Sequence, residues 1–189
     1  FSTKMGMVRK NRLIDIAKSG KRDLRETGKL SIKLNHNDKL ISVKLANDNQ
    51  DILLSTSIGK CLRFPLKKLR LFSGLNSGGV KGIKLEKDNY VISQSVLKHS
   101  FIDMNIRDEY LKYSSERRKN INTHNNENLN NFYNNEEFLL SITTHGFGKR
   151  TSAYEYRISN RGGKGITGIK TTNKNGKVID CFVINENDQ

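Results

Sequence analysis

Several residue types are scarce in this sequence, and each shortage excludes a class of protein. No tryptophan, one proline and two cysteines occur in 189 residues. Cys61 and Cys181 each lie in an apolar run, which favours buried free thiols in a reducing compartment over a disulfide framework. No stretch approaches the roughly 18 consecutive apolar residues that a membrane span needs. The sequence therefore predicts a cytosolic protein without a membrane segment.

Acidic side chains are also scarce compared with basic ones. The chain has 34 Lys and Arg against 19 Asp and Glu, a formal net charge of +15. The excess is uneven, because residues 1–97 hold 20 basic and 8 acidic side chains. Such an excess indicates an extended polyanion as the partner.

The usual signatures of catalysis are missing. The four histidines occur singly, with no His-x-x-x-His or Cys-x-x-Cys pair that would hold a metal. No Gly-x-x-x-x-Gly-Lys-Ser/Thr string is present, so the glycines of residues 162–165 do not form a nucleotide-binding loop of that kind. We expect neither a catalytic centre nor a cofactor in this chain.

One pattern is present three times. Each repeat has a head glycine and, 19 to 22 residues later, a tail glycine, and the pairs are Gly6 and Gly28, Gly59 and Gly79, and Gly146 and Gly165. A cation follows each head glycine by four residues: Lys10, Arg63 and Arg150. A small residue, an isoleucine and a lysine follow each tail glycine, and these lysines are Lys33, Lys84 and Lys170.

The repeat predicts an all-β, propeller-like fold with blades of four antiparallel strands. A period of roughly 50 residues is typical of propeller blades, which cannot bury their apolar faces alone. We expect blades at residues 1–48, 49–97 and 136–189, separated by an asparagine-rich insertion at residues 98–135. Closed propellers typically have about four to eight blades, so about three blades predict part of a larger ring.

Alternating apolar residues predict the individual strands. They are expected at residues 30–34, 40–45, 52–56, 61–64, 83–85, 90–97, 138–143 and 178–184. Residues 12–26 could form a short helix, but the counterpart in the second repeat contains Pro65, so we favour a strand leading into a basic loop. Nine of the sixteen residues from 120 to 135 are asparagine, which predicts a mobile loop without a packed core.

The recurring cations are the candidate binding residues. A ring of blades would place them as a periodic basic track, which suits a polyanion with regularly spaced phosphates. Arg161 and Lys164 flank two glycines, whose backbone N–H groups could also approach a phosphate. The predicted contacts are Lys10, Arg12, Lys29, Lys33, Arg63, Lys67, Lys68, Arg70, Lys81, Lys84, Lys149, Arg150, Arg161, Lys164 and Lys170. The scarcity of aromatic residues does not support stacking on single-stranded bases.

Two groups of strings resemble a known family. They are residues 59–64 with 79–85, and residues 145–151 with 155–157 and 165–170. In these strings the sequence resembles the C-terminal domain of the DNA gyrase A protein. The resemblance implies a β-pinwheel, a ring of about six blades that exchange strands and wrap duplex DNA around a basic rim, in support of negative supercoiling. Residues 161–165 match the last five positions of the family's Gln-Arg-Arg-Gly-Gly-Lys-Gly box, with Ser159 and Asn160 in place of the first two.

The resemblance also implies partners. The parent would be an ATP-dependent type IIA topoisomerase that uses ATP and Mg²⁺ outside this chain. Its partners would be the gyrase B subunit together with the rest of the gyrase A subunit, in an A2B2 assembly in the cytoplasm, at the nucleoid. The C-terminal domain of the topoisomerase IV A subunit shares the implied fold and is one alternative. A propeller-like docking module whose basic face meets an acidic protein is the other.

Overall fold

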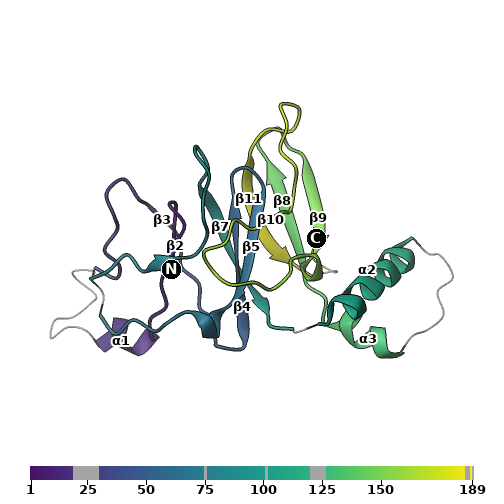
Figure 1. The fold of residues 1–189 in the computed structure, drawn as a ribbon, viewed down its shortest axis with the longest axis horizontal. Helices are drawn as coiled ribbons and strands as arrows, with labels where there is room; N and C mark the ends of the chain where they lie inside the picture. The colour runs from purple at the N-terminus through teal and green to yellow at the C-terminus, as the bar shows by residue number, and fades with distance from the viewer. Residues whose placement is uncertain (19–29, 75, 101, 120–126, 186–187, 189) are drawn as a thin grey trace.

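Three antiparallel sheets follow one another along the molecule, and two helices stand at one end (Figure 1). The computed structural model describes residues 1–18, 30–74, 76–100, 102–119, 127–185 and 188. In the part of the chain so described, no helix is long and apolar enough to cross a membrane.

Each of the three repeats supplies three strands of one sheet. The first has the order β3-β1-β2-β6 and consists of β1 (Ser2–Thr3), β2 (Met7–Val8), β3 (Leu40–Ser42) and β6 (Val80–Lys81). The second has the order β10-β5-β4-β7 and consists of β4 (Gln50–Thr56), β5 (Lys60–Pro65), β7 (Val91–Lys98) and β10 (Ile166–Thr167). The third has the order β11-β8-β9 and consists of β8 (Phe138–Thr143), β9 (Gly148–Ser152) and β11 (Val178–Ile184). The predicted all-β fold with four-stranded antiparallel blades is confirmed, with a third sheet of three strands among the described residues.

Neighbouring repeats exchange a strand. β6 belongs to the second repeat by sequence but pairs with β2 of the first, with Val80 opposite Val8. In the same way β10 of the third repeat pairs with β5 of the second, with Ile166 opposite Cys61. The exchange means that one repeat by sequence is not one sheet, so the expected boundaries between units stay predictions.

Each exchanged segment is held by the head glycine of the preceding repeat. The head glycines have positive φ, 80° at Gly6, 77° at Gly59 and 80° at Gly146, a conformation that glycine adopts without steric cost. The Gly6 carbonyl accepts a hydrogen bond of 2.8 Å from the Gly82 amide. The Gly59 carbonyl accepts the equivalent bond of 2.9 Å from the Gly168 amide. The same contact therefore joins the first repeat to the second and the second to the third.

Two apolar clusters fill the space between the sheets. One contains Val8 of the first sheet together with Leu54 and Phe64 of the second. The other contains Leu53 of the second sheet with Leu139 and Cys181 of the third. Because each cluster draws residues from two sheets, no sheet buries its apolar face alone.

Both cysteines are buried and free, as expected. Cys61 and Cys181 belong to the second apolar cluster, Cys61 on β5 and Cys181 on β11. A hydrogen bond to Cys181, together with burial, raises the pKa of the Cys61 thiol. The Cys61 thiol is therefore held in its neutral form inside the protein.

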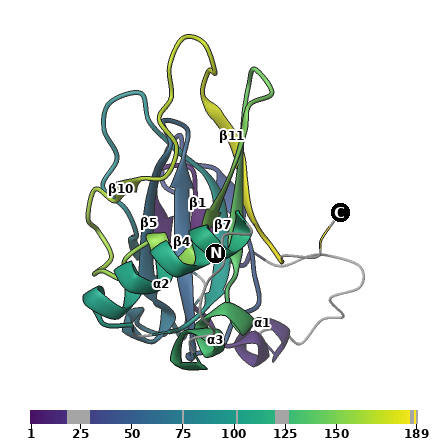
Figure 2. The same ribbon diagram turned by 90° about the vertical axis from the view of Figure 1, so that its right-hand side faces the viewer.

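The sheets have an inner and an outer end. β7 contacts both β3 and β11, so these three strands meet at the inner ends of their sheets. In the view of Figure 2, α2 lies in front of the strands. β6 and β10 lie at the opposite ends of the first two sheets. Residues on β6, on β10 and on the segments next to them therefore line the outer edge of the molecule.

The segment after the recurring cation differs from its prediction. A helix, α1 (Leu13–Lys18), replaces the expected strand, and its counterparts are single 3-10 turns, η1 (Leu66–Lys68) and η2 (Ala153–Glu155). Pro65 does not oppose this turn, because it stands just before the first turn residue with φ −67°. The basic loop was expected at residues 18–25, and its residues 19–25 lie outside the described residues.

The other expected strands fall into two groups. Those at 52–56, 61–64, 90–97, 138–143 and 178–184 are confirmed as β4, β5, β7, β8 and β11, with ends that agree to within two residues. The strand at 40–45 is shorter, as β3, and residues 30–34 form none. The strand expected at 83–85 was misplaced, because the exchanged pairing falls on Val80 and Lys81 instead.

The insertion is partly helical and packed, which corrects the expectation of a loop without a core. It contains α2 (Met104–Arg118) and α3 (Glu127–Asn134) (Figure 1). Tyr110 is fully buried and meets Tyr154 of the third repeat edge to face, with ring centroids 5.3 Å apart at 84°. Its hydroxyl donates a 2.8 Å hydrogen bond to Glu136. The asparagine content concealed this cluster, because the cluster also needs Tyr154, which lies outside the insertion.

Candidate nucleic-acid interface

The tail segments lie in series along the outer edge. The carbonyl of Lys33 lies next to Gly78, where an added Cβ would be 3.2 Å from that oxygen. The amide of Lys84 donates a 2.8 Å hydrogen bond to the Gly163 carbonyl. The first two tail lysines therefore contact, through their backbone, the glycine-rich loop of the next repeat. Repetition of this contact joins the three tail segments into one continuous edge.

Most of the predicted cations are exposed on this structure. Six have exposed side chains that form no hydrogen bond or ion pair with the described residues: Lys33, Lys67, Lys81, Lys84, Lys164 and Lys170. Because no acidic side chain in the described ranges neutralises them, they remain available to an anion. Lys29 lies outside the described residues.

Five further predicted cations are exposed but have one contact each. Lys68 donates to the Asn160 side chain at 3.1 Å, Arg161 to the Lys81 carbonyl at 3.0 Å, and Lys149 to the Gly168 carbonyl at 3.0 Å. The guanidinium groups of Arg70 and Arg150 lie over the rings of Phe72 and Phe138, 4.3 Å and 4.8 Å from the centroids. None of these contacts neutralises the charge, so the five extend the basic edge.

Arg12 is less available. Its guanidinium forms two hydrogen bonds of 2.8 Å with Asp15, in the first turn of α1. The hydrogen bonds to Asp15, followed by its charge, raise the pKa of Arg12. The pair is exposed to solvent, and such pairs contribute little to stability.

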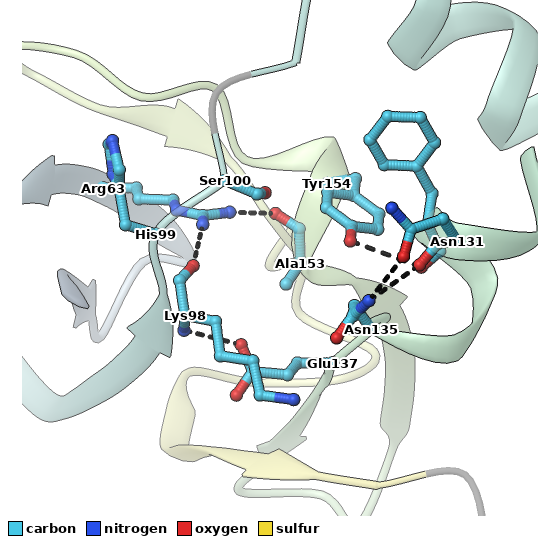
Figure 3. Close-up of a pocket in the computed structure, with 10 residues that line it drawn as sticks. Arg63, Lys98, His99, Ser100, Asn131, Asn135, Glu137, Ala153 and Tyr154 are labelled. Atoms are coloured by element: carbon cyan, nitrogen blue, oxygen red, sulfur yellow. Dashed lines mark hydrogen bonds between the residues drawn. The ribbon is translucent and has the colours of Figure 1, made fainter. Parts of the chain in front are cut away.

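Arg63 is not a surface residue, and its burial corrects the expectation that it contacts a polyanion. Its side chain is 3% exposed and pairs with Asp51 at 2.8 Å. The other guanidinium nitrogens donate to the carbonyls of Ala153 and Lys98, each at 2.8 Å (Figure 3). His99 completes the group, with Nδ1 2.7 Å from the second oxygen of Asp51. All three guanidinium nitrogens of Arg63 therefore donate to acceptors inside the protein.

The same position in the first repeat has a similar structural role. The Lys10 ammonium lies 2.9 Å from Asp48 and 3.3 Å from the Leu66 carbonyl. Leu66 begins η1 just as Ala153 begins η2, so each cation reaches the first carbonyl of the next repeat's turn. Recurrence of a cation at this position of the repeat thus reflects contact between repeats. Arg63 leaves the set of candidate phosphate contacts because it is buried, whereas a phosphate contact of Lys10 stays a prediction.

The glycine-rich loop at residues 161–165 also has a structural role. Gly162 and Gly165 have φ 83° and 75°, and the Gly162 amide donates a 2.6 Å hydrogen bond to the Gly82 carbonyl. That amide is therefore engaged by the neighbouring tail rather than free to bind phosphate. The side chains of Arg161 and Lys164 remain the loop's candidate anion-binding groups.

Two arginines with distinct roles were missing from the sequence prediction. Arg9 is 2% exposed, donates to the Asn11 side chain at 2.8 Å and to the Ser77 carbonyl, and lies over Phe72, so it ties the first repeat to the second. Arg157 is exposed, and its side chain forms no hydrogen bond or ion pair within the described ranges. The signal for Arg157 was its position, since it follows η2 just as Arg70 follows η1.

Comparison with known proteins identifies relatives along the whole chain. A family model described as the DNA gyrase C-terminal domain, beta-propeller, matches residues 50–96 and 137–185. The DNA gyrase A subunit of Rickettsia bellii (strain RML369-C) is 39% identical over 201 residues, which cover 100% of this chain and 22% of the relative. The DNA gyrase A subunit of Staphylococcus aureus (strain MRSA252) is 31% identical over 179 residues, covering 95% of this chain and 16% of the relative. The chain thus spans about a fifth of the length of such relatives.

Solved structures agree with the fold. The crystal structure of the C-terminal domain of DNA topoisomerase IV superimposes with a TM-score of 0.70 at 18% identity, covering 98% of this chain and 46% of that chain. The DNA gyrase A C-terminal domain superimposes with a TM-score of 0.59 at 17% identity, covering 98% of this chain and 47% of that one. At these identities the likeness concerns the fold, and the family assignment rests on the sequence match. The chain belongs to the DNA gyrase C-terminal domain family, whose fold is a β-propeller.

Proposed function

We propose that this chain binds duplex DNA without sequence specificity and bends it around the outer edge of its sheets, within a DNA gyrase A protein. The observation that carries the proposal is the series of exposed cations on consecutive tail segments, with Lys33, Lys84 and Lys170 at equivalent positions. Cations at a regular interval neutralise phosphates without reading bases.

The energetics favour many weak contacts over a few strong ones. Bending 20 to 30 base pairs by 40° to 90° costs about 1 to 6 kcal/mol. No single lysine can offset that cost, but a row of backbone contacts can, as in proteins that wrap DNA through charge and deformability alone. The proposal therefore requires both the lysines and their placement along one edge.

The parent protein's properties form part of the proposal. ATP and Mg²⁺ would be used by other parts of the protein, in an assembly of the gyrase B subunit with the rest of the gyrase A subunit in the cytoplasm, at the nucleoid. Gyrase is favoured over topoisomerase IV because the sequence relatives named above are gyrase A subunits. A docking module for an acidic protein is the alternative from another class.

Salt-dependent binding is the first test. The affinity for a duplex of about 40 base pairs is measured by fluorescence anisotropy at several salt concentrations, and each phosphate contact contributes about 0.9 to the slope of log K against log salt. Changing Lys84 and Lys170 together to glutamine is expected to weaken binding and to make the slope of log K against log salt less negative by about 2.

The control variant changes Lys39 and Lys177 to glutamine. These exposed lysines adjoin β3 and β11 at the inner ends of the sheets, and the charge change is the same. Binding by the control should match that of the unchanged protein. Equal losses in both double variants would argue for a diffuse charge effect, and affinity for an acidic protein but not for DNA would favour the docking module.

Bending is tested separately from binding. Nicked plasmid is religated in the presence of the protein, and the linking number of the product is measured. A protein-dependent shift in linking number is expected if the DNA follows the edge. Tight binding with no shift would contradict the bending part of the proposal and leave the binding part standing.

A further inference from the structure

We propose that the cleft between α2 and the third repeat is an additional phosphate-binding site, so that the insertion lengthens the DNA-binding edge. The inference rests on the proposed function, and one side of the cleft, α2, lies in a part of the chain that the family model does not match, since that match stops at residue 96 and resumes at residue 137. Arg107 on α2 and Arg157 on the third repeat are the residues assigned to it.

The cleft is a defined cavity. It has a volume of about 180 Å³. Met104 and Arg107 of α2 line one wall, and Arg157 and Ile158 line the other. Tyr154 also lines the cleft, and the ring of Tyr110 packs edge to face against it. The aromatic contact fixes where α2 stands, so the two arginines are positioned before any ligand arrives.

The charge in the cleft is unbalanced. Among the described residues that line it, none is acidic, and the buried guanidinium of Arg63 is already paired with Asp51. Arg157 has no ion-pair partner in the described part of the chain. Within the same ranges, the Arg107 side chain bonds only to its neighbour Asp108, at 2.7 Å, and that aspartate side chain is 62% exposed. Exposed pairs of this kind contribute little, so a phosphate can replace Asp108 at low cost.

Two guanidinium groups suit a phosphate better than two ammonium groups would. Each presents parallel N–H donors that match a pair of phosphate oxygens. Met104 and Ile158 add apolar groups to the lining of the cleft. The chemistry of the cleft therefore selects a phosphate rather than a neutral ligand.

The cleft is continuous with the proposed DNA-binding edge. Arg157 stands four residues before Arg161, which spans at most about 13 to 14 Å of extended chain. Ile158 forms a bridge with Arg63 on the outer side of β5, and Asn160 accepts a hydrogen bond from Lys68. DNA that contacts Arg161 and Lys68 would therefore pass the cleft, and Arg107 would extend the contact onto α2.

The test compares Arg107→Gln, Arg157→Gln and the double variant with Lys112→Gln. Lys112 is an exposed cation on the same helix, does not line the cleft, and provides a control with the same loss of charge. Binding to a duplex of about 40 base pairs is measured against salt. Each arginine variant should make the slope of log K against log salt less negative by about 0.9, and the double variant by about 1.8. Lys112→Gln should leave the slope unchanged.

A second readout locates the contact directly. Modification of arginine by phenylglyoxal, followed by peptide mass spectrometry, should show that duplex DNA protects Arg107 and Arg157. Unaltered slopes and no protection, in a protein that still binds DNA through its lysines, would overturn the phosphate site and leave the proposed function standing. Absence of DNA binding by the unchanged protein would overturn both.

Discussion

Replacing Gly59 with alanine is expected to destabilise the protein far more than the same change at Gly146. Both residues occupy the head turn of their repeat with nearly equal backbone angles, φ 77° and 80°. An alanine in this left-handed region costs about 1 to 2 kcal/mol at either position. The two substitutions therefore share the backbone cost and differ only in what surrounds the new methyl group.

The surroundings differ because, of these two glycines, Gly59 holds an exchanged segment of the next repeat and Gly146 holds none among the described residues. A Cβ at Gly59 would lie 2.0 Å from the Ile169 carbonyl oxygen, whereas a Cβ at Gly146 would meet nothing within 4 Å among the described residues. Backbone cannot rotate aside as a side chain can, so the segment that carries β10 must shift. Overpacking of this kind typically costs about 1 to 3 kcal/mol in addition.

Urea unfolding of both variants measures the difference, and hydrogen exchange locates it. The Gly168 amide, bonded to the Gly59 carbonyl, should exchange faster in Gly59→Ala and normally in Gly146→Ala. Equal losses of unfolding free energy in the two variants would mean that the exchanged segment does not depend on the head turn.

Comparison of the three repeats shows how much of the fold and of the candidate site the sequence could predict. The repeat predicted the all-β fold, and alternating apolar residues predicted most of the long strands, because these features depend on local side-chain preferences. Of the recurring cations, Lys10 and Arg63 occupy one structural position, because each reaches the first carbonyl of the next repeat's turn, and the equivalence of Arg150 stays a prediction. The environment of this cation was not predicted, because a buried ion pair and an exposed ion pair give the same residue pattern in the sequence.

Contacts between distant segments account for the other differences. The buried partners of Arg63 lie at Asp51, Lys98 and Ala153, which are up to 90 residues away. Placement of β6 depends on pairing with β2, about 70 residues earlier in the chain. The aromatic cluster of the insertion needs Tyr154 from the third repeat. Local patterns contain none of this information. The tail lysines are exposed, and their contact with DNA stays a prediction.

Replacing Asp51 with alanine is expected to cost about 3 to 5 kcal/mol of unfolding free energy. Asp51 is fully buried and accepts from both Arg63 and His99, so its removal leaves a buried guanidinium without its counter-ion. The loss should be seen as a lower urea midpoint. Asp51→Asn, which preserves the shape and one acceptor oxygen, should be intermediate and provides a folded variant if the alanine variant does not fold.

The matched control is Asp48→Ala, which removes the partner of the equivalent cation in the first repeat. Asp48 is 68% exposed and its pair with Lys10 is reached by water, so the expected cost is about 0 to 1 kcal/mol. The contrast between the two aspartates measures the effect of burial together with that of His99, the second partner that Asp51 has and Asp48 lacks. A cost at Asp51 as small as that at Asp48 would show that Arg63 finds other partners, and the buried group would then not hold the second and third repeats together.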